Sequence, residues 1–151
     1  MRALALLPCE KIIRDAVGGP SLVATFQEIN LQFPSEVKLP TNAVIPKEWA
    51  VFGLWQISDA EIQHVYSQHL EIIWPDGSPF FKQAQPVPTD KPDWITSIMN
   101  IVGFPVGQPG KLVIRLWMES EGEKVGDAIE TFVKVNHGVL PDATSPSVMN
   151  L

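Results

Sequence analysis

Three histidines are the only imidazole groups in the chain, and they are the first residues to consider as metal ligands or general bases. They are His64, His69 and His137. If the segment around His64 and His69 is a strand, the two residues have opposite parity and point to opposite faces of a sheet. They then cannot share a metal ion. Glu61 and His64 have a spacing that brings them together on a helix, but Glu-x-x-His without a second copy is a weak metal pattern. We expect no metal and no cofactor.

Nucleophilic catalysis needs a serine, threonine or cysteine beside a base, usually on a sharp turn. The chain has no Gly-x-Ser-x-Gly motif, and its one cysteine, Cys9, precedes Glu10. A neighbouring carboxylate raises the pKa of a thiol and makes it less reactive. Gly18-Gly19 lacks the further glycines and the lysine of a phosphate-binding loop. The sequence therefore predicts a protein that is not an enzyme.

Acidic residues lie mostly in predicted loops, where solvated carboxylates are the ordinary case. Asp76, Asp93 and Glu121 are examples. Loops that converge at one end of a sandwich can assemble a calcium site from such residues. No Asp-x-Asp spacing supports that alternative.

Five tryptophans are the most unusual feature of the composition: Trp49, Trp55, Trp74, Trp94 and Trp117. Large aromatic side chains usually fill a core or a subunit contact. The alternative is a flat platform that stacks on sugar rings. Trp117 has the parity opposite to an alternating apolar series, so we predict that it is exposed. The apolar series is Leu112, Ile114, Leu116 and Met118.

Charge and length exclude several classes of function. The chain has 151 residues and a formal net charge of −6, with 11 Lys and Arg against 17 Asp and Glu. Phosphate recognition needs clustered basic residues, so we expect neither nucleic acid nor an anionic membrane surface as a partner. One cysteine forms no intramolecular disulfide, and the apolar run Ala3 to Leu7 is shorter than a signal-peptide core. These features predict a single domain and a cytoplasmic location.

The elements that must position these residues are strands. Apolar runs rich in Val, Ile, Phe and Trp alternate with Pro and Gly clusters at the spacing of a sandwich or barrel. We predict an all-β fold: a two-sheet, mainly antiparallel β-sandwich, immunoglobulin-like or C2-like, with seven to nine strands and at most one short helix. Gly18-Gly19-Pro20 is the first predicted turn. Residues 1–136 form the predicted domain, and residues 137–151 a flexible C-terminal tail.

Two N-terminal segments carry finer expectations. Between Ser21 and Phe33 the apolar residues move from even to odd positions, which predicts a bulge or sharp bend near Gln27-Glu28. Pro34, Pro40 and Pro46 then interrupt the chain, leaving at most a short strand around Val37 to Leu39.

The segment from Trp49 to Ile57 is apolar on both faces. Such a strand is covered on both sides or lies at a subunit contact. We therefore predict a homodimer through this region. The alternative is that the connection from Pro34 to Pro46 covers the second face within the monomer. The predicted interface residues are Trp49, Val51, Phe52, Leu54, Trp55 and Ile57.

The segment Ser58–Leu70 fits two readings. Apolar residues recur at helical spacing, and Ser58 with Glu61 has the spacing of a capping box. Even-numbered apolar residues also lead directly into Pro75-Asp76-Gly77, which is the turn chemistry that follows a strand. We favour a strand from about His64 to Trp74 and keep the helix as the alternative.

The later hairpins are clearer. Phe80 to Gln85 is the predicted returning arm after Pro75-Asp76-Gly77, and Lys124 to Val135 is predicted to pair with Lys111 to Glu119 across a hairpin at Glu121-Gly122-Glu123.

The order of the N-terminal features resembles a known family. These features are Ala5-Leu6-Leu7, Cys9-Glu10, a Gly-Gly turn, the run Ser21 to Phe26, Phe33-Pro34 and Trp74-Pro75-Asp76-Gly77. The chain resembles, over roughly residues 2 to 135, an uncharacterised bacterial family of small β-sandwich domains, a domain of unknown function. The resemblance implies the sandwich and transfers no catalytic residue. Where that family commonly has glycine after the Ser-Leu run, this chain has Ala24.

Together these observations predict a non-enzymatic interaction or assembly module of a bacterial cytosolic protein, with an unidentified protein partner or a second copy of itself. The alternative is a carbohydrate-binding module that uses exposed tryptophans.

Overall fold

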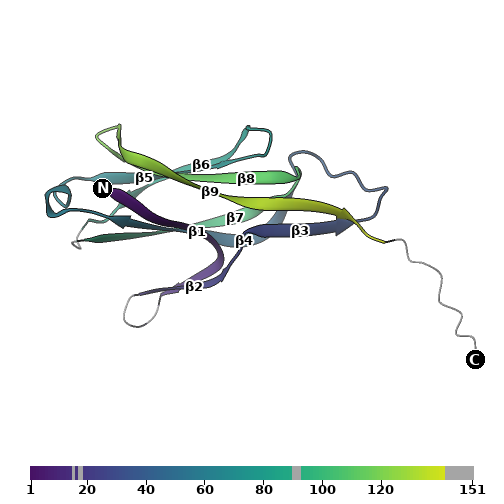
Figure 1. Ribbon diagram of the computed structural model, residues 1–151, viewed down its shortest axis with the longest axis horizontal. Helices are drawn as coiled ribbons and strands as arrows, with labels where there is room; N and C mark the ends of the chain where they lie inside the picture. Colours follow the sequence, from purple (N-terminus) through teal and green to yellow (C-terminus); the bar gives the residue numbers. More distant parts are fainter. Residues whose placement is uncertain (15, 17–18, 90–92, 142–151) are drawn as a thin grey trace, which may run out of the picture.

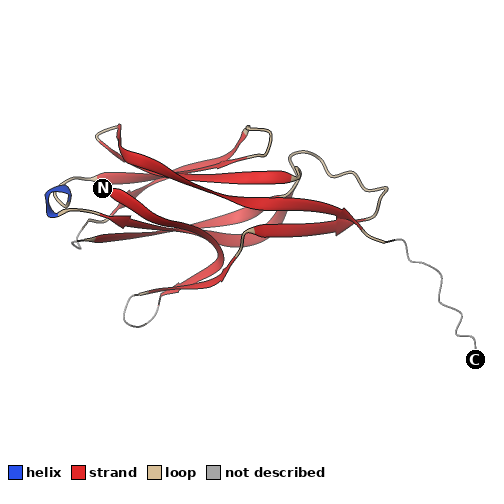
Figure 2. Cartoon of the chain, viewed as in Figure 1, coloured by secondary structure: helices blue, strands red, loops and turns tan. Residues whose placement is uncertain are grey.

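The computed structural model describes residues 1–14, 16, 19–89 and 93–141. Nine strands form two sheets, and one turn of 3₁₀ helix is the only helical element in these residues. Figure 1 shows the two sheets packed face to face, and Figure 2 shows the short helix at one end. The predicted all-β sandwich is confirmed.

The two sheets differ in size. The four-stranded sheet has the order β2-β1-β4-β7, and the five-stranded sheet has the order β3-β9-β8-β5-β6. Every neighbouring pair is antiparallel except β3 and β9, which are parallel. The bounds are β1 Arg2–Arg14, β2 Pro20–Thr25, β3 Glu28–Phe33, β4 Val44–Gln56, η1 Asp59–Glu61, β5 Tyr66–Ile73, β6 Pro79–Val87, β7 Trp94–Pro105, β8 Gly110–Ser120 and β9 Glu123–Val139.

Strand β8 supplies the centre of the core. It lies between β5 and β9, and its predicted core residues Leu112, Ile114 and Leu116 are all 0% exposed. The alternation of its side chains puts one face against the four-stranded sheet and the other face outside. The register predicted for this strand is therefore confirmed.

One buried polar contact links the sheets. Trp55 of β4 donates from Nε1 to Oε1 of Gln68 on β5 over 3.1 Å, and Gln68 is 1% exposed. The other end of the Gln68 amide lies 3.3 Å from the sulfur of Met99. Gly53 permits the close approach, because an added Cβ would lie 2.7 Å from Cδ2 of Leu116.

The change of parity near Gln27-Glu28 marks a change of sheet rather than a bulge within one strand. The chain bends at Gln27, but β2 ends at Thr25 in one sheet and β3 begins at Glu28 in the other. The apolar residues change parity because the strands bury opposite sides in different sheets. Just before the crossing, Ala24 has φ 51°. This left-handed conformation costs a residue with a Cβ roughly 1–2 kcal/mol and favours glycine.

No strand forms at Val37 to Leu39, where the prolines allow at most a short one. Tight turns occupy this connection, with Val37 N–H bonded to the Pro34 carbonyl and Ala43 N–H to the Pro40 carbonyl. β4 begins at Val44, before Pro46, and its pairing with β7 is irregular between Ile45 and Glu48. The irregularity accommodates a residue that has no backbone N–H.

The ambiguous segment contains both predicted elements in sequence. Ser58 and Glu61 form the capping box of the single turn η1, and β5 then begins at Tyr66. The strand interpretation is confirmed for Tyr66 to Ile73, because the buried and half-buried residues alternate along it.

Both predicted hairpins are present, but the domain boundary at residue 136 is wrong. β9 continues to Val139, since His137, Gly138 and Val139 pair with β3. This parallel pairing joins segments more than 100 residues apart, and the local sequence carries no periodic signal for it. Gly18 of the first predicted turn and residues 142–151 of the predicted tail lie outside the described residues.

The packing of β8 gives the first prediction. We expect Ile114→Ala to lower the free energy of unfolding by about 2 to 5 kcal/mol, because it removes buried methyl groups and leaves a cavity. The neighbouring Val113→Ala change, on the half-buried outer face, is the matched control and should have a much smaller effect. Urea unfolding of both variants measures the difference, and equal midpoints would contradict the assigned core face.

Candidate functional site

The outer face of the four-stranded sheet is apolar along its centre. Leu7 of β1, Phe52 of β4 and Ile98 of β7 lie directly opposite one another in three adjacent strands. The next row contains Leu54, flanked by Ala5 and Thr96. We call the large apolar residues of this surface the apolar face: Leu7, Phe52, Leu54, Trp94, Ile98 and Val102.

The two most exposed residues of the apolar face lie on β7. Phe52 in the middle is only 7% exposed and Leu7 is 37% exposed, whereas Trp94 is 52% and Val102 is 78% exposed. The neighbouring strands shield the centre, but β7 has a neighbour on only one side. The open apolar surface therefore lies along β7.

The predicted interface separates into two groups. Trp49, Val51, Trp55 and Ile57 are at most 3% exposed and belong to the core, so they are unavailable to a partner. Phe52 and Leu54 lie on the apolar face. The strand is apolar on both faces because the core takes one of them and neighbouring side chains shield much of the other.

Sequence reasoning missed the residues of β7. Trp94 to Phe104 is an apolar run, and its even positions form an outer face that the sequence analysis does not identify. These positions hold Trp94, Ile98 and Val102, and the run contains no charged residue. Lack of charge over a full strand length was the available signal.

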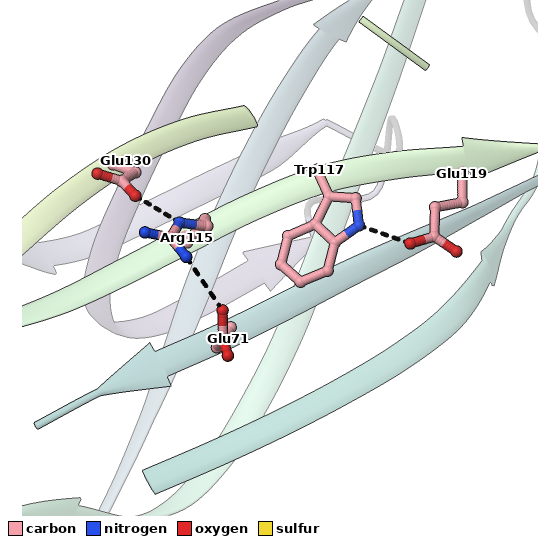
Figure 3. A network of polar contacts seen from close by, with 5 residues as sticks. All are labelled: Glu71, Arg115, Trp117, Glu119 and Glu130. Atoms are coloured by element: carbon pink, nitrogen blue, oxygen red, sulfur yellow. Dashed lines mark hydrogen bonds and ion pairs between the residues drawn. The ribbon is translucent and has the colours of Figure 1, made fainter. Parts of the chain in front are cut away.

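The outer face of the five-stranded sheet carries charged residues that pair across its strands, beside an apolar row formed by Ile73, Val113 and Phe132. Arg115 of β8 bonds through Nε to Glu130 of β9 and through Nη1 to Glu71 of β5, the latter over 3.3 Å. All three residues occupy directly opposite positions in adjacent strands. Figure 3 shows Arg115 between the two carboxylates. The positive charge of Arg115 therefore lies between two carboxylates and offsets one of their two negative charges.

Trp117 is not the exposed aromatic that its parity predicts. It points to the outer face, but it is only 9% exposed. His69 stacks on its ring at a centroid distance of 5.3 Å, and the Trp117 Nε1 donates to Glu119 over 2.8 Å (Figure 3). The ammonium groups of Lys82 and Lys124 lie within 5.8 Å of the ring centroid. These contacts leave the Trp117 ring without an open face on which a sugar ring could stack.

The three histidines lie in different surroundings. His64 precedes β5, His69 lies 3.1 Å from Glu119 on the outer face of the five-stranded sheet, and His137 contacts the Val106 carbonyl at 2.6 Å. In the described residues, no group of three His, Cys, Asp or Glu side chains is placed to hold a metal ion. Nor does any described Ser, Thr or Cys side chain hydrogen-bond to His69.

Cys9 is a buried thiol. Its sulfur donates to the Ala50 carbonyl over 3.6 Å, and the residue is 0% exposed. Burial raises the pKa of the Cys9 thiol, because the thiolate loses its hydration. The direction is the one expected from sequence, but its cause is desolvation rather than Glu10.

A hollow of about 560 Å³ opens at the end of β5 beside the β8–β9 hairpin. Its lining includes Glu119 and Glu121, together with Val65, which is 82% exposed. Tyr66 forms part of the wall, and burial raises the pKa of its hydroxyl. The carboxylates of Glu119 and Glu121 make the hollow unfavourable for an anionic ligand.

Glu61 carries the largest resolved electrostatic shift. Its carboxylate pairs with the Met1 ammonium and accepts hydrogen bonds from the Ser58 N–H and hydroxyl. The contact with Met1, followed by the bond from the Ser58 N–H, lowers the pKa of Glu61 from 4.5 to about 2. The pair fastens the start of β1 to the turn η1.

No protein-family model matches the chain, and no curated protein matches its sequence. The resemblance drawn from the order of its motifs therefore stays a prediction. Among the described residues, no helix has the length and apolar character needed to cross a membrane.

The Glu61 contacts predict a pH-dependent stability. Because the pKa of Glu61 is depressed in the folded state, its contribution is present above about pH 4.5 and is lost as pH falls toward about 2. Glu61→Gln should lower the free energy of unfolding near neutral pH, and the difference from wild type should shrink across that interval.

Urea titrations over a pH series measure this difference, using protein with no residue added before Met1. Glu121→Gln, in an exposed hairpin position, is the control. A gap between wild type and Glu61→Gln that stays constant down to about pH 2 would refute the assignment.

Proposed function

We propose that the protein is a non-enzymatic assembly module that associates with a second copy of itself through the β7 side of the apolar face. The observation that carries this proposal is an uncharged strand, Trp94 to Phe104, at the edge of a sheet. On that strand two large apolar side chains, Trp94 and Val102, are more than half exposed.

Burial of this surface supplies a driving force. Removing apolar surface from water is favourable by roughly 25 cal/mol per Å², before the loss of rotational and translational freedom on association is subtracted. An apolar, uncharged surface cannot bind a partner through opposite charges. Its partner must therefore present an apolar surface as well. A second copy does so automatically, and a two-fold contact brings the same patch together.

The distribution of charge supports an interaction role over catalysis. Arg115 forms ion pairs with both Glu71 and Glu130 on the outer face of the five-stranded sheet, while Glu119 contacts Trp117 and His69. These groups hold strands and an indole ring in place. The single buried cysteine and the family resemblance support a bacterial cytosolic setting.

The proposal predicts a concentration-dependent dimer. Light scattering on protein eluting from a sizing column should give a mass rising toward twice that of one chain at micromolar concentrations. Val102→Glu should return the mass to that of a monomer, because it places a charge on the open part of the apolar face.

Val65→Glu is the matched control, since Val65 is equally exposed at 82% but lies outside the apolar face. Its mass should follow that of wild type. A wild-type mass that stays monomeric at every concentration would refute homotypic assembly.

A further inference from the structure

Among the four edge strands in the described part of the chain, β7 lacks the features that usually protect a sheet edge. Strands β2 and β3 are six residues long, and β6 carries Pro79, Lys82 and Pro86. Short length, proline and lysine are the usual devices that prevent an edge from pairing with another chain. β7 has twelve residues, and its first proline is Pro105 at the very end.

The backbone groups that face away from β4 can be assigned from printed contacts. The Asp93 carbonyl accepts from the Ile57 N–H over 3.0 Å, so odd-numbered residues of this strand point toward β4. The register is regular from Trp94 to Val102. Because backbone groups alternate along an antiparallel strand, those of the even-numbered residues point outward.

A side chain at the middle of the edge supports this assignment. The Ile98 carbonyl, which has even parity, accepts from the amide Nε2 of Gln85 on β6 over 3.5 Å. Its partner is therefore a side chain of the other sheet. This long contact is readily exchanged for a backbone N–H of another chain.

We propose that β7 pairs antiparallel with β7 of a second copy across a two-fold axis at Ile98, which joins two four-stranded sheets into one continuous sheet. This inference rests on the proposed homotypic assembly and specifies its geometry. Ile98 faces its own equivalent, and Thr96 faces Asn100 of the second copy. The outward-pointing backbone N–H and C=O groups of one copy then face those of the other copy along the whole edge.

The register follows from the exposed side chains. With the axis at Ile98, Trp94 lies opposite Val102 of the second copy, so the most exposed residues of the apolar face cover each other. A shift of the pairing by two residues places Trp94 opposite Asn100 or Phe104 instead. A shift by one residue sets outward groups against groups already bonded to β4.

The first test removes one backbone donor. Thr96→Pro eliminates an N–H that points away from β4, so the fold is retained while pairing with a second copy is lost. Thr96→Val keeps the N–H and is the matched control. We expect a monomer for Thr96→Pro and a dimer for Thr96→Val by light scattering, with unchanged circular dichroism for both.

The second test reads the register. Ile98→Lys and Ile98→Glu should each be monomeric alone, because two like charges meet at the axis. An equimolar mixture should recover the dimer, since opposite charges then face each other. Recovery requires residue 98 to face residue 98, which face-to-face packing of the sheets does not impose.

The outcomes separate the two proposals. A wild-type dimer that persists in both Thr96→Pro and Ile98→Lys overturns the β7 pairing but leaves homotypic assembly in place. Failure of the Lys and Glu variants to form a mixed dimer overturns the Ile98 axis. A wild-type protein that is monomeric throughout overturns both proposals.

Discussion

Strand β4 is hydrogen-bonded along both of its edges, to β1 and to β7. Its odd-numbered side chains pack against the five-stranded sheet, and the bond from Trp55 to Gln68 fixes the two sheets relative to each other in the middle of the core. A buried amide or indole N–H without a partner would be strongly unfavourable, so this contact restricts how the sheets can slide. Gly53 permits the approach, and the even-numbered side chains are left facing outward.

The outer faces of the two sheets carry different kinds of side chain. On the five-stranded sheet, the outward face includes charged residues that pair across three strands, as Arg115 does with Glu71 and Glu130, beside the apolar row of Ile73, Val113 and Phe132. On the four-stranded sheet, the outward face carries the large side chains of the apolar face, and the most exposed of these, Trp94 and Val102, lie on β7. A protein with a net charge of −6 thus carries an uncharged strand at one sheet edge. An edge of that kind favours assembly with another strand.

Local sequence features predicted the parts of the fold that depend on neighbouring residues. Strict alternation identified the core face of β8, and turn chemistry located the hairpins at Asp76-Gly77 and Glu121-Gly122. Long-range contacts account for the errors. The change of sheet after Thr25 and the parallel pairing of His137 with β3 depend on segments far away in the chain. Parity likewise gave the direction of Trp117, but side chains from other strands determine its exposure.

Sequence features predicted only part of the candidate site, because the rest of it also depends on long-range contacts. Apolar residues on both faces of β4 indicated an exceptional environment, and Phe52 and Leu54 lie on the apolar face. The most open residues, Trp94 and Val102, belong to β7, and only the strand order places them at an edge. Sequence spacing carries no information on which strand ends a sheet.

Amide hydrogen exchange along β7, measured at increasing protein concentration, tests the assembly of this edge most directly. The account predicts that the N–H groups of Thr96, Ile98 and Asn100 become protected as concentration rises, while those of Ser97 and Met99 are protected throughout by β4. Fast exchange at Thr96, Ile98 and Asn100 that does not change with concentration would contradict it.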